Sequence, residues 1–249
     1  MSRQTDFPPF SSLQFIKKTL ITASTTHIND VDTRVCVFNA AGGGASGGMG
    51  ATTTGRGGSA ASFMLNYLIT GFLGGESCVI TIGVGGASVT TASTNGNNGT
   101  ATSFIIAGSE HLSFSIPGGG NSINYWQAGD FYGVLRDTTL GVASSNTNGS
   151  DLAYNGLWRG ANGGEYNAIF IQGGNSLHVP AGDYNGPSGV GASTVFGKGG
   201  NGSANNALPV AGNGTGYGSG GGATTSFILG VLDQSGAGAG GMIEILEYK

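Results

Sequence analysis

The sequence predicts a mainly β and irregular fold, in which β-strands and extended helices of the polyglycine-II (polyproline-II-like) type form a glycine-rich sandwich with almost no α-helix. Glycine fills 51 of the 249 positions, about three times its ordinary share. Hydrophobic residues make up 38% of the chain and charged residues only 9%. The hydrophobic residues cluster in strand-length runs and not at helical spacing, which indicates a folded β protein and argues against disorder.

Six apolar runs bounded by Gly, Asn and Ser predict strands or buried extended segments. β-branched and aromatic residues dominate these runs, as is typical of strands. The runs lie at residues 34–39, 78–84, 103–108, 168–172, 226–232 and 242–248. We expect the first and the last of them to pair and to close the domain.

The glycines between these runs predict closely packed extended helices. Collagen is excluded, because its triplet period is absent and the chain has only six prolines. Each ordered glycine costs about 0.5–1 kcal/mol relative to Ala, so a fold tolerates many of them only where no side chain fits. Helices with three residues per turn leave their N–H and C=O groups free to pair with neighbouring helices. The glycine segments are therefore predicted to form a hydrogen-bonded layer, with the Ser/Thr/Asn stretches as exposed turns.

Two cysteines, Cys36 and Cys78, each lie inside an apolar run. Free cysteine is among the most buried residue types, so both are expected to be buried thiols. A disulfide between them stays open as an alternative if the two runs are neighbouring strands.

Enzyme motifs occur only where abundant glycine produces them by chance. Residues 44–48 (GASGG) fit the nucleophile-elbow pattern, but no helix pattern follows them. Residues 197–202 and 236–241 fit G-x-G-x-x-G, but neither opens a helix in a βαβ unit. The sequence therefore predicts no catalytic residue and no cofactor. A glycan depolymerase stays an alternative, since two carboxylates that meet only in space are invisible in a sequence.

Metal ligands are not predicted either. His27, His111 and His178 lie far apart in the sequence. Asp30 and Asp32 lack the spacing of a calcium loop, so we expect them to solvate a turn before the strand at 34–39.

Charge and hydropathy exclude two kinds of partner. The net charge is −4 and the nine Lys and Arg are scattered, whereas nucleic-acid binding needs a basic stripe or patch. No run approaches the roughly 18 apolar residues that span a bilayer, and residues 1–10 lack the apolar core of a signal peptide. We expect no nucleic-acid partner, no membrane insertion, and synthesis in the cytoplasm.

Six glycine-rich words follow one another in a characteristic order. They are TRVCVFNAAGGGASGG (33–48), LITGFLGGESCVITIGVGGAS (68–88), GNNGTATSFIIAG (96–108), GASTVFGKGGNGS (191–203), TGYGSGGGA (215–223) and GAGAGGMIEILEYK (236–249). In this order they resemble the glycine-rich domain of tailed-phage tail fibres and adhesins, over roughly residues 14–120 and 187–249. The resemblance implies a sandwich of polyglycine-type helices that presents variable loops to a receptor on the bacterial surface.

Residues 121–186 depart from that pattern and read as an insertion rich in aromatic side chains. The insertion holds both tryptophans of the chain. Tyr and Trp offer large rigid contact areas at low entropic cost, and Asn, Ser and Gly offer adaptable hydrogen bonding. We predict that the receptor is bound by Tyr125, Trp126, Phe131, Tyr132, Arg136, Tyr154, Trp158, Arg159 and Tyr166. The alternative is that the aromatic residues form a small core of the insertion itself.

The resemblance implies a non-enzymatic adhesin of the virion tail fibre or tail tip. Its receptor would be a polysaccharide or an outer-membrane protein. Residues 1–28 are expected to attach the glycine-rich domain, residues 29–249, to other virion tail proteins or to sister subunits, and we expect a homotrimer. The alternatives are a structural virion protein for capsid decoration or tail assembly and, less favoured, an ice-binding protein. Ice binding needs a flat, regular Thr/Ala face, which the aromatic insertion does not provide.

Overall fold

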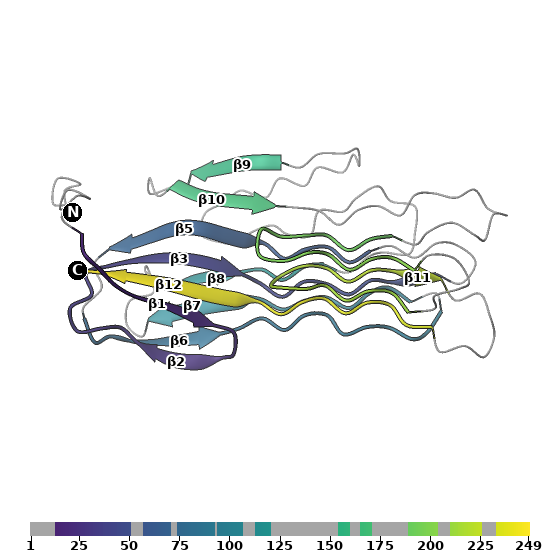
Figure 1. Ribbon diagram of the computed structural model, residues 1–249, viewed down its shortest axis with the longest axis horizontal. Coiled ribbons are helices and arrows are strands. Elements are labelled where there is room, and N and C mark those ends of the chain that lie inside the picture. Colours follow the sequence, from purple (N-terminus) through teal and green to yellow (C-terminus); the bar gives the residue numbers. More distant parts are fainter. Residues whose placement is uncertain are drawn as a thin grey trace.

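The computed structural model describes most of the chain outside the predicted insertion. The described residues are 13–50, 57–70, 74–92, 94–106, 113–120, 154–159, 165–170, 189–203, 210–225 and 233–249, with the backbone alone for 154–159 and 165–170. They form an elongated molecule with two β-sheets at one end and a long bundle of extended chain at the other (Figure 1). We call these parts the sandwich and the slab.

The larger sheet of the sandwich has six antiparallel strands. Their order is β1 (Phe15–Ile21), β12 (Met242–Tyr248), β3 (Val35–Ala41), β5 (Phe63–Thr70), β10 (Glu165–Phe170) and β9 (Tyr154–Arg159). β12 pairs with β3 over its full length, from Met242 opposite Ala41 to Tyr248 opposite Val35. This pairing confirms that the first and last predicted runs close the domain.

The smaller sheet packs against the larger one and has four antiparallel strands. Their order is β2 (Thr25–Ile28), β6 (Ser77–Thr81), β7 (Thr102–Ile106) and β8 (Phe114–Ile116). Strict alternation of exposed and buried residues along β6 shows that one face of this sheet is turned to the core and the other to solvent.

A cluster of aromatic rings fills the space between the two sheets. The ring of Phe38 on β3 lies 4.7 Å from that of Phe104 on β7 and 5.3 Å from that of Phe114 on β8. Phe38 and Phe104 are completely buried, and so are Ile243 and Ile245 of β12. Each such side chain contributes about 1.5–3 kcal/mol through removal from water, so this cluster holds the two sheets together.

In the slab, residues 42–48 show the hydrogen bonding of a helix with three residues per turn. Their N–H groups donate in rotation to three different segments: Gly42 to Ser62, Gly43 to Thr100, Gly44 to Ala239, Ala45 to Ser59, Ser46 to Asn97 and Gly47 to Gly236. Every third residue thus meets the same neighbour, three residues further back along it. This is the pattern expected of packed helices of the polyproline-II type, which have no internal hydrogen bonds.

The carbonyl groups of residues 42–48 accept hydrogen bonds from three further segments, so this helix has six neighbours. Gly44 accepts from Gly86, Gly43 from Gly119 and Ala45 from Gly221. The six neighbours are the segments 57–62, 83–90, 94–100, 117–120, 218–224 and 235–241. Hydrogen bonds also join each neighbour to the next around the ring. The slab is therefore a hexagonal lattice of extended helices.

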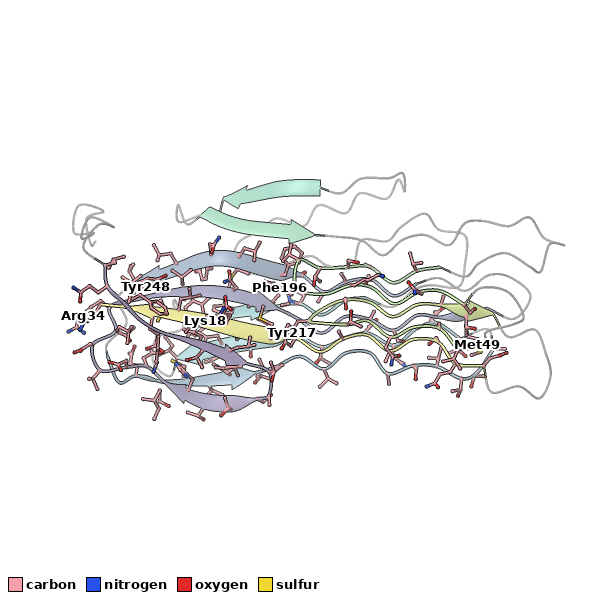
Figure 2. The ribbon with its side chains drawn as sticks, in the orientation of Figure 1. Lys18, Arg34, Met49, Phe196, Tyr217 and Tyr248 are labelled. Atoms are coloured by element: carbon pink, nitrogen blue, oxygen red, sulfur yellow. The ribbon has the colours of Figure 1, made fainter. Side chains whose placement is uncertain are left out.

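Residues 218–224 form a second centre of the lattice. This segment is bonded to 42–48, 57–62 and 235–241 and also to 189–194, 197–203 and 210–215. Residues 41–50 and 218–224 are buried without interruption, as expected for helices that are surrounded on all sides. At their ends the parallel pair β4 (Met49–Gly50) and β11 (Thr224–Thr225) closes the slab, and Figure 2 shows Met49 at this far end.

Close packing explains why the slab needs glycine. A Cβ added to Gly43, Gly44 or Gly220 would lie under 3.0 Å from the carbonyl oxygen of Val84, Ser219 or Gly58 respectively. Those oxygens belong to backbones that are fixed by hydrogen bonds of their own, so they cannot easily move aside. Glycine is therefore the residue that fits where one helix approaches the next.

The described residues confirm the predicted fold class, since they consist of strands and extended chain with no helix. The predicted strand at 78–84 forms β6 over 77–81 and then becomes slab helix, because Gly83, Gly85 and Gly86 allow neighbouring backbones to approach. The run at 168–172 overlaps β10, and the run at 226–232 lies outside the described residues. The described part of the chain has no helix long and apolar enough to cross a membrane.

Candidate functional site

Four of the predicted receptor-binding residues lie on a hairpin at one edge of the larger sheet. Tyr154, Trp158 and Arg159 belong to β9, and Tyr166 belongs to β10. The register places Trp158 opposite Tyr166 and Arg159 opposite Glu165. β10 continues the sheet by pairing with β5, and β9 is the last strand of the sheet. The structure therefore brings Trp158 and Tyr166 together on adjacent strands.

The other five predicted residues lie outside the described part of the chain. They are Tyr125, Trp126, Phe131, Tyr132 and Arg136. Their role in binding stays a prediction.

A buried carboxylate at the terminal end of the sandwich forms a second cluster of polar groups. Glu247 on β12 is completely buried. Its Oε2 accepts hydrogen bonds from Thr33 Oγ1 at 2.6 Å and from the Asp30 amide at 2.8 Å. Its Oε1 lies 3.1 Å from His27 Nε2 and 3.3 Å from Lys17 Nζ. Glu247 therefore ties β1, β2 and the turn before β3 to β12.

The partners of Glu247 determine its charge state. Burial by itself raises the pKa of a carboxyl group, because the charged form loses hydration. The hydrogen bonds from Thr33, the Asp30 amide and Lys17, together with the charge of Lys17, outweigh that effect and lower the pKa of Glu247. Glu247 is thus held as a carboxylate whose two oxygens are both engaged, which suits a structural role better than proton transfer.

Two thiols lie beside this carboxylate. Cys36 is the register partner of Glu247 on β3, and Cys78 is the register partner of His27 on β6. Both are free and completely buried, as predicted. Burial is the main cause that raises the pKa of Cys36, and it raises the pKa of Cys78 to about 12. Cys, His and Glu thus meet in one layer, but the thiols stay protonated and are poor nucleophiles at neutral pH.

No local sequence pattern predicts the Glu247 cluster, because its members lie at opposite ends of the chain. Thr33 and His27 are separated from Glu247 by 214 and 220 positions. The local prediction for Asp30 and Asp32 is confirmed: the Asp32 amide donates to Asp30 Oδ1 at 3.0 Å in the turn before β3. Among the described residues, no three His, Cys, Asp or Glu side chains are arranged to hold a metal ion.

Comparison with known proteins identifies the scaffold. A family model described as a glycine-rich domain matches residues 19–248. This match begins within β1 and covers the rest of the sandwich, the slab and the β9–β10 hairpin. No curated protein matches the chain.

Proposed function

Since the chain belongs to the family of glycine-rich domains, we propose that it is a non-enzymatic adhesin of a phage tail fibre or tail tip. In this proposal it binds a polysaccharide or an outer-membrane protein on the bacterial surface, acts as a homotrimer and is joined to other tail proteins of the virion. The glycine-rich scaffold is compatible with this role and with a purely structural role, so the residues that the scaffold presents must distinguish the two.

The observation that carries the proposal is the place of the β9–β10 hairpin. Register partners in antiparallel strands lie on the same face of a sheet, so Trp158, Tyr166, Tyr154 and Phe170 belong to one face of the hairpin. Through Ala168, which lies opposite Met64 of β5, this is the face of the sheet to which Met64 belongs. Tyr154 and Trp158 belong to β9, the last strand of the sheet, and Tyr166 and Phe170 belong to β10 beside it. Aromatic residues provide the rigid contact area that binding surfaces use. The hairpin is joined to β5 of a sheet with a fully buried core, so it stands on a rigid base.

The physical properties of the scaffold suit an extracellular binding protein. Backbone hydrogen bonds and apolar contacts hold the sandwich and the slab together, and few described charged pairs contribute. Such contacts depend little on ionic strength, because salt screens charges and not buried apolar surfaces. We therefore expect the scaffold to keep its shape across the salt concentrations that a virion meets.

Binding to cells tests the proposal. The fluorescently labelled full chain is incubated with a panel of intact bacterial strains and then used to compete with phage adsorption on a strain that it binds. Trp158→Ala combined with Tyr166→Ala should remove binding. Phe15→Ala is the matched control, because Phe15 is an exposed aromatic residue on β1, the opposite edge strand of the same sheet. Circular dichroism verifies that each variant is folded.

Two results would contradict the proposal: a parent protein that binds no strain, or a folded double variant that binds as well as the parent. Release of oligosaccharides from a bound capsule would instead indicate a depolymerase. Labelling of virions over the capsid and not the tail would indicate a decoration protein.

A further inference from the structure

Two asparagine–glycine pairs lie on adjacent outer helices of the slab. Asn201–Gly202 belongs to the segment 197–203, and Asn213–Gly214 belongs to the segment 210–215, which is hydrogen-bonded to it. Both asparagines are exposed. The next residue is serine in the first case and threonine in the second, so the two local sequences are nearly the same. Any difference in their chemistry must therefore come from their surroundings in the slab.

An asparagine followed by glycine deamidates readily, because glycine has no Cβ to hinder its own backbone nitrogen. This nitrogen attacks the side-chain Cγ of the asparagine. A new N–C bond closes a five-membered imide ring, the Cγ–Nδ2 bond breaks, and ammonia leaves with the proton of the glycine amide. Water then opens the ring to aspartate or to isoaspartate, in which the backbone runs through the side chain and gains one carbon atom. Water is the only co-reactant, and the product has one additional negative charge.

The lattice opposes this reaction at Asn213, where one residue of a third helix holds both reacting groups. The Gly214 amide donates to the Ala237 carbonyl at 2.9 Å, and the Ala237 amide donates to Asn213 Oδ1 at 2.9 Å. The attacking nitrogen thus keeps its proton in a hydrogen bond, and the side chain under attack is fixed to the segment 235–241. Ring closure requires the peptide unit between Asn213 and Gly214 to rotate out of its extended conformation, which breaks both hydrogen bonds.

Asn201 has fewer restraints. Within the described part of the chain, neither its side chain nor the Gly202 amide makes a hydrogen bond. The carbonyl of the peptide unit between the two residues accepts one hydrogen bond, from the Gly212 amide at 2.8 Å. Ring closure at Asn201 therefore breaks one hydrogen bond, whereas ring closure at Asn213 breaks two. One hydrogen bond of ordinary strength corresponds to about a fivefold difference in rate.

We propose that Asn201 is a deamidation site of the folded protein and that the lattice protects Asn213. The reaction requires no enzyme, and it makes one outer helix of the slab subject to slow chemical ageing. The inference does not depend on receptor binding.

Isoaspartate at this position would also change the slab. The Gly200 and Ser203 amides donate to the carbonyl groups of Gly220 and Ala223 on the second centre of the lattice. Both the donors and the acceptors are three residues apart, so the two helices keep the same repeat. One additional backbone carbon between Gly200 and Ser203 removes this match, and Ser203 loses its hydrogen bond to the centre.

Peptide mass spectrometry of the aged protein tests the proposal. The full chain is incubated at mildly alkaline pH, either folded or in guanidinium chloride, and the fraction of aspartate plus isoaspartate at each position is followed with time. In the folded chain Asn201 should react at least about fivefold faster than Asn213, and in the denaturant the two should react at similar rates. Equal rates in the folded chain, or a faster reaction at Asn213, would overturn the inference.

Ala237→Pro tests the protection of Asn213 directly. Proline removes the amide hydrogen that binds Asn213 Oδ1, and its fixed φ suits an extended three-fold helix. Asn213 should then react faster, by up to about fivefold, with no change at Asn201. Ala87→Pro is the matched control, because Ala87 is an exposed alanine on another outer helix and its replacement leaves the contacts of Asn213 in place. With folding verified by circular dichroism, an unchanged rate at Asn213 in Ala237→Pro, or an equal increase in Ala87→Pro, would contradict the assigned protection.

The unfolding of aged chains tests the effect on the slab. Ion exchange separates the chains that have gained a negative charge. Those with isoaspartate at position 201 should unfold at a lower urea concentration than Asn201→Asp, which has the same charge on a normal backbone. Equal unfolding midpoints would refute the loss of the Ser203 hydrogen bond.

Discussion

Two glycines on one slab segment provide a sharp test of the lattice. Gly238 and Gly240 both belong to the segment 235–241, which borders the central helix 42–48. A Cβ on Gly238 would lie under 3.0 Å from the carbonyl oxygen of Gly44, whereas the nearest atom to a Cβ on Gly240 would be the Gly83 oxygen, at an ordinary contact distance of 3.7 Å. Replacement by Ala therefore makes the same chemical change in two different environments.

We expect Gly238→Ala to destabilise the fold by about 2–4 kcal/mol. Overpacking a tight interior costs about 1–3 kcal/mol. Moving the two backbones apart also weakens the hydrogen bonds from the Gly44 amide to Ala239 and from the Gly47 amide to Gly236, each of which contributes about 1 kcal/mol. The smaller entropy of the unfolded chain returns about 0.4–1 kcal/mol. Gly240→Ala has only this last effect and should be neutral or stabilising.

Urea denaturation followed by circular dichroism measures both variants against the parent, with the slope of the transition as a check for two-state behaviour. The difference between the two variants is the decisive quantity, since it cancels the entropic effect that they share. If the two free energies of unfolding agreed within about 0.5 kcal/mol, the argument that backbone contact selects glycine in the slab would be refuted.

The Glu247 cluster and the thiols yield three further predictions. Glu247→Gln should lower the free energy of unfolding by about 2–4 kcal/mol, because buried donors lose a charged acceptor. Glu244→Gln is the control: Glu244 forms a more exposed ion pair with Lys18, and its replacement should cost under about 1 kcal/mol. Urea titration measures the free energy of unfolding of both variants. Because the folded-state pKa of Glu247 is lowered, its stabilisation is complete above the unfolded-state pKa and is lost as the pH falls through the folded-state pKa. The deficit of Glu247→Gln should therefore shrink between about pH 7 and about pH 3, and an unchanged deficit would contradict the assigned charge. Cys36 and Cys78 should not react with a disulfide reagent at neutral pH until urea unfolds the chain, and rapid labelling of the native protein would show that they are not buried thiols.

Local patterns predicted much of the sandwich but not all of it. The run at 242–248 coincides with β12, and the run at 34–39 nearly coincides with β3. β5 is not among the predicted strands, because its alternation is interrupted by a bulge in which Leu65 and Asn66 face Asn39 of β3. Asn66 has a positive φ of 53° and donates its amide to Asn39 Oδ1. β1 is not among the predicted strands either, because the adjacent Lys17 and Lys18 interrupt its run of apolar residues.

The slab and the polar cluster show where local reasoning ends. Glycine content favoured extended helices, but the choice of 42–48 and 218–224 as the two centres depends on which segments meet, and those partners lie up to about two hundred positions away. The contacts of Glu247 are equally distant in sequence, because its hydrogen-bond and ion-pair partners lie near the beginning of the described chain. For the candidate receptor site, the sequence supplied the residue types and the hairpin supplied the register between Trp158 and Tyr166.

Because the slab helices have three residues per turn, the effect of an insertion or deletion in them depends on whether its length is a multiple of three. Adding one residue to a strand exchanges its two faces, but adding one residue to a three-fold helix turns every following position by a third of a revolution and carries a side chain into a site that only glycine fits. Adding three restores the orientation and lengthens that helix by about 9 Å. Related chains should therefore differ by multiples of three within the helices that surround 42–48, and by any number of residues in the connections between them.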